Sequence, residues 1–331
     1  MGLVHIPKAW NERRAGRTTP EGIYLQRREV LKALGLGTLA LGSPQSLWAS
    51  RDDDLTRPAL GRRFADRFPV PRNEIYELGD DRTLTDELTA SSHNNFYEFT
   101  VAKDKVWQLA RDYPVDPWTL RVHGLVHEPR TFGLDDLFRG SFREALEERH
   151  YRFRCVERWS MQVPWTGFPL RKLLDVVKPM SKARWIRFIS FEDRQGLPGQ
   201  RKQTWYEWPY YEALRIDEAV HDLTLFTVGI YGHGLPMQHG APWRIVAPWK
   251  YGFKSPKSLV EIEVVEGRPG TFWNDSEPEE YGFFSNVDPG QPHPRWTQRF
   301  ETDIGSGATR ETQPYNGYGD LVAHLYDGDE I

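Results

Sequence analysis

Cys155 is the residue of this chain best suited to bind a metal or to attack a substrate. It lies in the stretch Tyr151-Arg-Phe-Arg-Cys-Val-Glu-Arg-Trp-Ser160, where Arg152, Arg154 and Arg158 flank it. Neighbouring cations lower the pKa of a thiol and favour the thiolate, the form that binds a soft metal or acts as a nucleophile. The competing interpretation is a buried, inert cysteine, the commoner fate of a free thiol.

The segment Tyr231–Lys257 is a candidate anion-binding pocket. Glycines and prolines are too dense there for a helix, and basic and aromatic residues recur, notably Arg244, Lys250, Tyr251, Lys254 and Lys257. Backbone amides in glycine turns bind anions together with Arg and Lys, and Trp and Tyr rings stack on flat heterocycles. The segment therefore favours a phosphorylated, planar cofactor; the alternative is a surface loop with scattered basic residues. It is not a dinucleotide-binding fingerprint, because Gly232-x-Gly234 is followed by Leu-Pro rather than by a helix start.

Two other patterns are weaker candidates for a functional site. Asn94-Asn95-Phe96-Tyr97-Glu98 is a polar and aromatic cluster, which alone is more often a loop than a site. His123 and His127 have the spacing of a zinc helix. Their segment is predicted to be a strand, however, in which residues four apart lie roughly 13 Å from each other. A zinc site there is therefore not expected.

The composition is that of a globular protein with an unusual share of aromatic residues. The chain has 331 residues and a formal net charge of −4, with 39% hydrophobic, 27% charged and 13% aromatic residues. A sequence pI of about 6.2 argues against a dedicated nucleic-acid binder, and a mean hydropathy of −0.64 excludes a bundle of membrane spans. With a single cysteine there is no disulfide framework and no four-thiolate zinc site.

Residues 1–49 are predicted to be a twin-arginine export signal. Arg27 and Arg28 precede a short, glycine-interrupted apolar run, Val30–Gly42, and Leu47-Trp48-Ala49-Ser50 supplies small residues for cleavage. The competing interpretation is a buried N-terminal helix. Residues 1–49 hold seven of the 43 basic and three of the 47 acidic residues, so the remaining chain, 50–331, has a net charge of −8. The predicted location is the periplasm.

The elements that must position these residues indicate one α+β domain dominated by strands. Short helices are expected over 101–109, 134–138 and 170–177, and strands over 118–126, 185–191, 223–231, 243–247 and 259–265. In the last of these, Val260, Ile262 and Val264 alternate with Glu261 and Glu263, which predicts a half-buried strand. Short helices followed by many strands with Pro and Gly turns are typical of a single α+β domain.

Taken together, three motifs resemble one family closely. They are Arg154-Cys-Val-Glu157, the cluster Asn94–Glu98, and Gly240-Ala-Pro-Trp-Arg with the Pro-Trp-Lys-Tyr-Gly-Phe-Lys that follows it. The family is the molybdopterin-dependent catalytic subunit of the periplasmic protein-methionine-sulfoxide reductase, within the sulfite oxidase superfamily. The resemblance runs from Ile6-Pro7 to Asn316-Gly317-Tyr318 and so covers nearly the whole chain.

The resemblance implies a single sulfite-oxidase-type molybdopterin-binding domain with β-rich mixed sheets and short helices. It also implies one Mo-molybdopterin per chain, without an added nucleotide. Cys155 matches the protein thiolate that binds the metal, and is thereby the expected catalytic residue. The remaining matched positions line the pterin and metal pocket or hold the pterin and its phosphate: Asn94, Tyr97, Glu98, Ser190, His239, Arg244, Ser255, Pro256 and Lys257. Ser190 stands where relatives often carry Thr, and His239 where some carry Asn.

The implied activity is the reduction of methionine sulfoxide residues in periplasmic proteins by oxygen-atom transfer to molybdenum. Electrons are then expected from the quinone pool through a haem-containing inner-membrane subunit, and no nucleic-acid partner is expected. A second hypothesis is another sulfoxide or sulfite oxidoreductase of the same fold, which extra arginines around the metal would indicate. A third is an exported Trp-rich binding protein in which Cys155 is inert.

Overall fold

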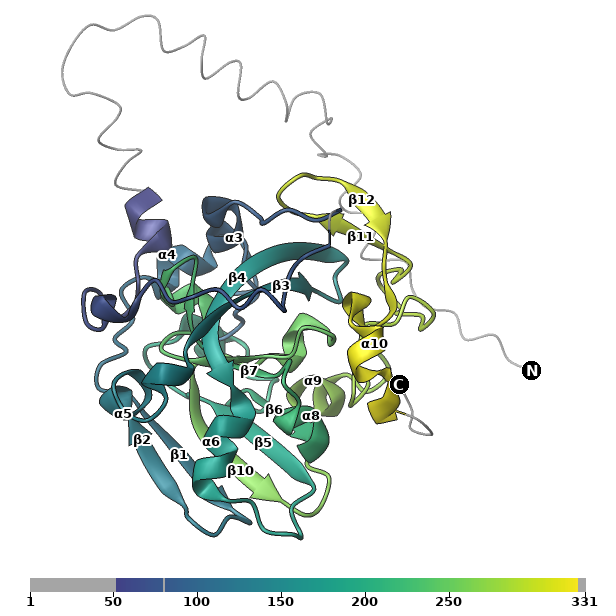
Figure 1. Ribbon diagram of the computed structural model, residues 1–331. Helices are drawn as coiled ribbons and strands as arrows, with labels where there is room; N and C mark the ends of the chain where they lie inside the picture. The colour runs from purple at the N-terminus through teal and green to yellow at the C-terminus, as the bar shows by residue number, and fades with distance from the viewer. Residues whose placement is uncertain (1–51, 80, 327–331) are drawn as a thin grey trace, which may run out of the picture. The chain divides into compact units, whose positions relative to one another are not determined.

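The computed structural model describes residues 52–79 and 81–326 (Figure 1). The predicted export signal lies outside these ranges, and the boundary at residue 49 stays a prediction. Within the described ranges, no helix is both long and apolar enough to span a membrane.

A five-stranded mixed sheet forms one half of the fold. Its strand order is β2 (Arg130–Gly133), β1 (Thr119–Gly124), β10 (Leu259–Val265), β5 (Trp185–Ser190) and β6 (Tyr211–Arg215). Strands β1 and β10 are parallel and the other pairs are antiparallel. In Figure 1 this sheet forms the lower part of the described chain.

A seven-stranded mixed sheet forms the other half. Its main path is β12 (Thr309–Glu311), β11 (Phe300–Asp303), β4 (Trp159–Pro169), β7 (Leu225–Ile230) and β8 (His233–Gly234). Strand β3 (Glu147–Arg154) pairs along β4, and β9 (Arg244–Val246) pairs with β7. The prediction of one β-rich α+β domain with mixed sheets is confirmed.

The helices are short, as predicted. They are α3 (Glu87–Ser92), α4 (Val106–Ala110), α5 (Leu134–Phe138), α6 (Leu170–Val177), α7 (Pro198–Lys202), α8 (Ile216–Val220), α9 (Phe272–Ser276) and α10 (Gly319–Val322). Helix α6 has the expected bounds because Leu170, Leu173, Leu174 and Val177 form one buried stripe. Their side chains join an apolar core to which strands of both sheets contribute.

The expected helix over 101–109 is shorter than predicted. It begins only at Val106, because Val101 lies in a bend and residues 103–105 form a turn. The Ala102 N–H donates to Thr100 Oγ1 at 3.2 Å, and the Lys105 N–H donates to the Ala102 carbonyl at 2.9 Å. Such local side-chain bonds compete with the helix.

The predicted alternation in β10 is interrupted at its start. Ile262 and Val264 are buried as expected, but Val260 is only half-buried and Leu259 takes its place in the core. The cause is a β-bulge, because the pairing with β5 shifts register between Leu259 and Glu261. One extra residue in a strand reverses the faces of the residues before it.

Strands β3 and β4 were not predicted, and they carry the turn that positions Cys155. All of β4 after Trp159 is buried, so the strand shows no alternation of polar and apolar residues. Pro164 and Gly167 also favour a loop at this position in the sequence, because both residue types are uncommon inside strands. The turn between β3 and β4 is closed by the Cys155 N–H, which donates to the Trp159 carbonyl at 2.9 Å. Arg158 adopts a left-handed conformation in this turn, with φ 74°.

Candidate functional site

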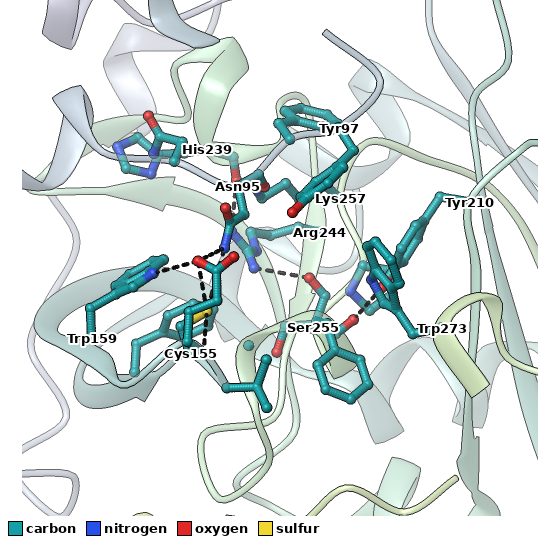
Figure 2. Close-up of a pocket in the computed structure, with 18 of the residues that line it drawn as sticks. Asn95, Tyr97, Cys155, Trp159, Tyr210, His239, Arg244, Ser255, Lys257 and Trp273 are labelled. Carbon is teal, nitrogen blue, oxygen red and sulfur yellow. Dashed lines mark hydrogen bonds between the residues drawn. The ribbon is translucent and has the colours of Figure 1, made fainter. Parts of the chain in front are cut away.

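One cavity of about 890 Å³, including its open mouth, gathers the chemistry-bearing residues. The turn between β3 and β4, the segment after α3 and the connection between β9 and β10 line it. Helix α9 and its following loop add aromatic residues. Figure 2 shows Cys155 and Trp159 at one side of the cavity and Tyr210 and Trp273 at the other. Every residue that the resemblance assigned to the site lies in this lining except Ser190.

The Cys155 thiol is buried, with 7% of the residue exposed. Its sulfur accepts hydrogen bonds from Asn95 Nδ2 at 3.4 Å and from the Glu157 N–H at 3.4 Å. Burial, reinforced by the nearby Glu157 carboxylate, raises the pKa of the Cys155 thiol to about 12. A metal that binds through this sulfur must therefore displace a firmly held proton.

The expectation that the flanking arginines leave Cys155 with a lowered pKa is wrong, because burial outweighs the opposing effect of Arg154. Arg154 weakly opposes the rise, but its buried guanidinium lies 3.3 Å from Glu301 Oε2. Arg152 donates to Gln313 instead. Successive residues of a strand point to opposite faces, so proximity in sequence does not bring these cations to the sulfur.

Glu157 lies at the centre of a group of polar contacts beside the thiol, which we call the polar wall. Glu157 was not assigned to the site from the sequence. Its Oε2 accepts from Trp159 Nε1 at 3.1 Å and from Asn95 Nδ2 at 3.3 Å, and it pairs with Lys103 Nζ at 2.9 Å. Both residues of the ion pair keep some exposure, 27% for the Lys103 side chain and 13% for that of Glu157. The only sequence signal for Glu157 was its place two residues after the cysteine, and Lys103 had none.

His93 completes this wall. Its ring packs edge-on against Trp159 with the centroids 4.9 Å apart, and its Nε2 has no hydrogen-bond partner. Burial, and then the positive charge of Lys103, lowers the pKa of His93. The imidazole is therefore neutral at neutral pH.

Arg244 and Lys257 form the cationic end of the cavity. Arg244 donates to the carbonyls of His239 at 3.0 Å and Ser255 at 2.9 Å, and Lys257 donates to the Asn95 carbonyl. Neither cation forms a salt bridge with a carboxylate of the described residues. Burial lowers the pKa of Arg244 to about 9. Burial, and then Arg244, lowers the pKa of Lys257. Two buried cations without a bonded anion are costly, so this end is built for an anionic ligand.

The other lysines of the segment 231–257 do not belong to this anion pocket. Lys250 pairs with Glu218 at 2.5 Å, and Lys254 pairs with Glu212 at 2.5 Å. All four side chains are at most 1% exposed and lie outside the cavity lining. The sequence predicted that the basic residues of this segment form one anion pocket, and the structure corrects this. Lys250 and Lys254 form buried ion pairs within the fold, whereas Arg244 and Lys257 line the cavity.

The remaining predicted residues hold the walls in place. His239 Nε2 lies 3.1 Å from Ser91 Oγ, and burial together with Lys257 keeps the pKa of His239 well below its ordinary value. Ser255 Oγ accepts from the Ala247 N–H at 3.2 Å. Ser190 lies behind the lining, where its hydroxyl donates to the Lys257 carbonyl at 2.7 Å.

Two segments of the cavity lining pack closely against the backbone of a glycine. A Cβ on Gly240, whose φ is +98°, would lie 2.7 Å from Lys257 Cβ. A Cβ on Gly199 would overlap the Tyr97 carbonyl, and the Gly199 N–H donates to the Glu98 carbonyl at 2.9 Å. These glycines allow the Lys257 and Tyr97–Glu98 segments to pack against their neighbours. Burial raises the pKa of the Glu98 carboxyl, and the positive charge of Lys257 offsets part of this rise.

Two comparisons with known proteins gave a match. The family model of the oxidoreductase molybdopterin-binding domain matches residues 108–273, about half of the chain, and includes Cys155, Arg244 and Lys257. The sulfane dehydrogenase SoxCD from Paracoccus pantotrophus is a similar solved structure, with 15% sequence identity and a TM-score of 0.39. That match covers 60% of this chain and 45% of the SoxCD chain, so this protein spans less than half of its length.

The cavity suits a molybdenum cofactor on observations of its own. A single buried thiol supplies a soft ligand at one end. Arg244 and Lys257 supply charge for a phosphate at the other, and the buried Asn94 Oδ1 and Asn95 Oδ1 have no hydrogen-bond partner. Within the described part of the chain, no cluster of three or more His, Cys, Asp or Glu residues could hold a metal ion. The chain belongs to the oxidoreductase molybdopterin-binding domain family, and its cofactor is Mo-molybdopterin.

Proposed function

We propose that the protein reduces methionine sulfoxide residues in periplasmic proteins. The observation that carries this choice within the family is the carboxylate of Glu157, whose Oε2 lies 3.8 Å from Cys155 Sγ. The other groups that contact the sulfur are the Asn95 amide and a backbone N–H. No cation among the described residues contacts it. Because Lys103 neutralises Glu157, the groups around the thiol supply no net positive charge to hold the sulfite dianion, whereas a neutral sulfoxide needs only a hydrogen-bond donor such as Asn95 Nδ2.

When bound, Mo-molybdopterin supplies two-electron oxygen-atom-transfer chemistry. The overall reaction consumes one sulfoxide, two electrons and two protons, and yields one thioether and one water. Cys155 would hold the metal, while Arg244 and Lys257 would bind the pterin phosphate. Glu157 Oε2, paired with the partly exposed Lys103, links the space beside the thiol to solvent and can hold a proton for the departing oxygen.

The electrons and the location are part of the same proposal. The two electrons would come from the quinone pool through a haem-containing inner-membrane subunit. The twin-arginine signal predicted over residues 1–49 supports a periplasmic location, because that pathway exports proteins already folded around a cofactor. Oxidised periplasmic proteins would be the substrates.

The test compares two reactions of the molybdenum-loaded protein. Reduced viologen dye should be oxidised rapidly when methionine sulfoxide is added, whereas ferricyanide should not be reduced when sulfite is added. Glu157→Gln should slow sulfoxide reduction by at least tenfold, because one proton-holding carboxylate is lost. Sulfite oxidation faster than sulfoxide reduction in the wild-type protein would favour the second hypothesis, a sulfite oxidoreductase of the same fold. Molybdenum and pterin contents, measured on each sample, control for loss of cofactor.

A further inference from the structure

The aromatic wall of the cavity continues outward through two loops. The loop 203–210, between α7 and β6, places Tyr210 in the cavity lining and leaves Trp205 70% exposed. The loop 277–299, after α9, places Tyr281 in the lining and leaves Trp296 half-buried. Trp273 of α9 contacts both loops, because its ring packs against Tyr206 of the first and Tyr281 of the second.

Tyr206 and Trp205 of the first loop continue from Trp273 as a row of rings, which we call the Trp205 arm. The ring centroids of Trp273 and Tyr206 are 5.4 Å apart, and those of Tyr206 and Trp205 are 5.8 Å apart. A single exposed tryptophan needs no explanation. Here, however, the exposed ring ends a row that begins in the active-site cavity.

The second loop forms the Trp296 arm. The centroids of Tyr281 and His293 are 5.6 Å apart, and those of His293 and Trp296 are 4.8 Å apart. The guanidinium of Arg295 covers the Trp296 ring at 4.4 Å and pairs with Glu280. Glu280 neutralises the charge of Arg295, so the aromatic rings, with the guanidinium stacked on Trp296, are the main recognition surface of this arm.

We propose that these two arms bind the polypeptide on either side of an oxidised methionine. This inference rests on the proposed function. The sulfoxide can reach the cavity only if the backbone that carries it lies across the mouth. An extended chain advances about 3.3 Å per residue, so the step between neighbouring rings corresponds to about two residues. Each arm therefore matches three or four residues of extended chain.

The chemistry of the arms selects a kind of substrate. Trp, Tyr and His rings offer apolar faces at low entropic cost, and they bind apolar side chains better than charged ones. The expected substrate is an unfolded, extended segment with apolar residues flanking the sulfoxide. A folded protein that buries the same segment would not reach the rings.

The experiment uses the molybdenum-loaded protein and three substrates. They are free methionine sulfoxide, a peptide of about nine residues with a central methionine sulfoxide and Leu flanks, and the same peptide with Gly and Ser flanks. The variants are Trp205→Ala and Trp296→Ala, with Trp205→Phe to restore a ring. Leu321→Ala, which truncates a residue 50% exposed on α10 and outside the cavity lining, is the matched control.

Each alanine variant should lower kcat/KM for the Leu-flanked peptide about tenfold relative to that for free methionine sulfoxide, mainly through KM. Trp205→Phe should recover most of this loss, and Leu321→Ala should behave as the wild type. The wild type itself should prefer Leu flanks to Gly and Ser flanks. The ratio of peptide to free-substrate kcat/KM cancels any difference in cofactor loading.

An unchanged ratio in both alanine variants would overturn the proposal, as would a wild type indifferent to the flanking residues. If the variants lost only turnover driven by the membrane donor, with peptide turnover by reduced dye intact, the arms would be a docking surface for that donor instead. Failure of the wild type to reduce even free methionine sulfoxide would overturn the proposed function together with this inference. That result is distinct, because it appears without any variant.

Discussion

The buried state of Cys155 predicts a quantitative chemical behaviour in the cofactor-free protein. The pKa of its thiol rises from an ordinary value of 9.0 to about 12, chiefly through burial and secondly through Glu157. Only the thiolate reacts with iodoacetamide. At pH 8 the thiolate fraction should therefore be about a thousandfold smaller than in an ordinary cysteine. The same shift corresponds to about 4 kcal/mol that the metal–sulfur bond must supply at neutral pH.

The assay is alkylation of the cofactor-free protein between pH 7.5 and pH 10.5, followed by mass spectrometry. The rate should rise tenfold for every pH unit across this range without levelling off, because the titration midpoint lies above it. The protein unfolded in denaturant serves as the reference. Steric protection alone would slow alkylation but would leave the midpoint near its ordinary value. A plateau that begins near pH 9 would therefore refute the reasoning, whatever the absolute rate.

Glu157→Gln provides the matched variant for this assay. Removing the carboxylate removes the second cause of the raised pKa and leaves burial in place. Alkylation at pH 8 should become several-fold faster, with the same slope against pH. An unchanged rate would show that the carboxylate does not act on the sulfur.

Four further predictions concern the metal ligand, the cofactor phosphate, the fold and export. Cys155→Ser should abolish sulfoxide reduction while the urea-unfolding midpoint changes little, and retained turnover would contradict the role of the thiol as metal ligand. Arg244→Ala should lower the molybdenum content of the purified protein at least tenfold at limiting cofactor, because a charge-assisted bond to phosphate is worth about 1.5–3 kcal/mol; full loading would argue against phosphate binding there. Gly240→Ala should destabilise the fold by about 1–3 kcal/mol in urea titrations, since its φ is +98° and the added Cβ meets Lys257. Replacing Arg27 and Arg28 by Lys should trap the precursor in the cytoplasm, as fractionation would show, and a normal periplasmic yield would contradict twin-arginine export.

Local patterns were sufficient to predict several elements. The bounds of α5 and α6 match the prediction because each helix is marked by residues within or next to it. Helix α6 has a stripe of buried apolar residues, and α5 has residues at its N-terminus that favour a helix start. At that start, the Gly133 N–H donates to Asp136 Oδ2 at 2.8 Å. Strand β4 escaped prediction because it is buried on both faces, which removes the alternation that marks a strand.

The site was predictable as a set of residue types but not as a network. The thiol, the Asn94–Glu98 cluster, Arg244 and Lys257 came from motifs, and the structure gathers them around one cavity. The pairing of Glu157 with Lys103 was not predictable, because it joins segments whose approach depends on the turn after β3.

By itself, the sequence determined the molybdopterin-binding domain family, the fold class and the one thiol available as a soft ligand, because motifs and composition are properties of the chain alone. Only the tertiary structure decided which cations are free to bind an anion. Lys250 and Lys254 meet buried carboxylates from β6 and α8, whereas Arg244 and Lys257, in the same segment, meet none. It also reversed the expected direction of the Cys155 pKa. Charge pairing and desolvation depend on distances and burial, and packing between segments remote in sequence sets both.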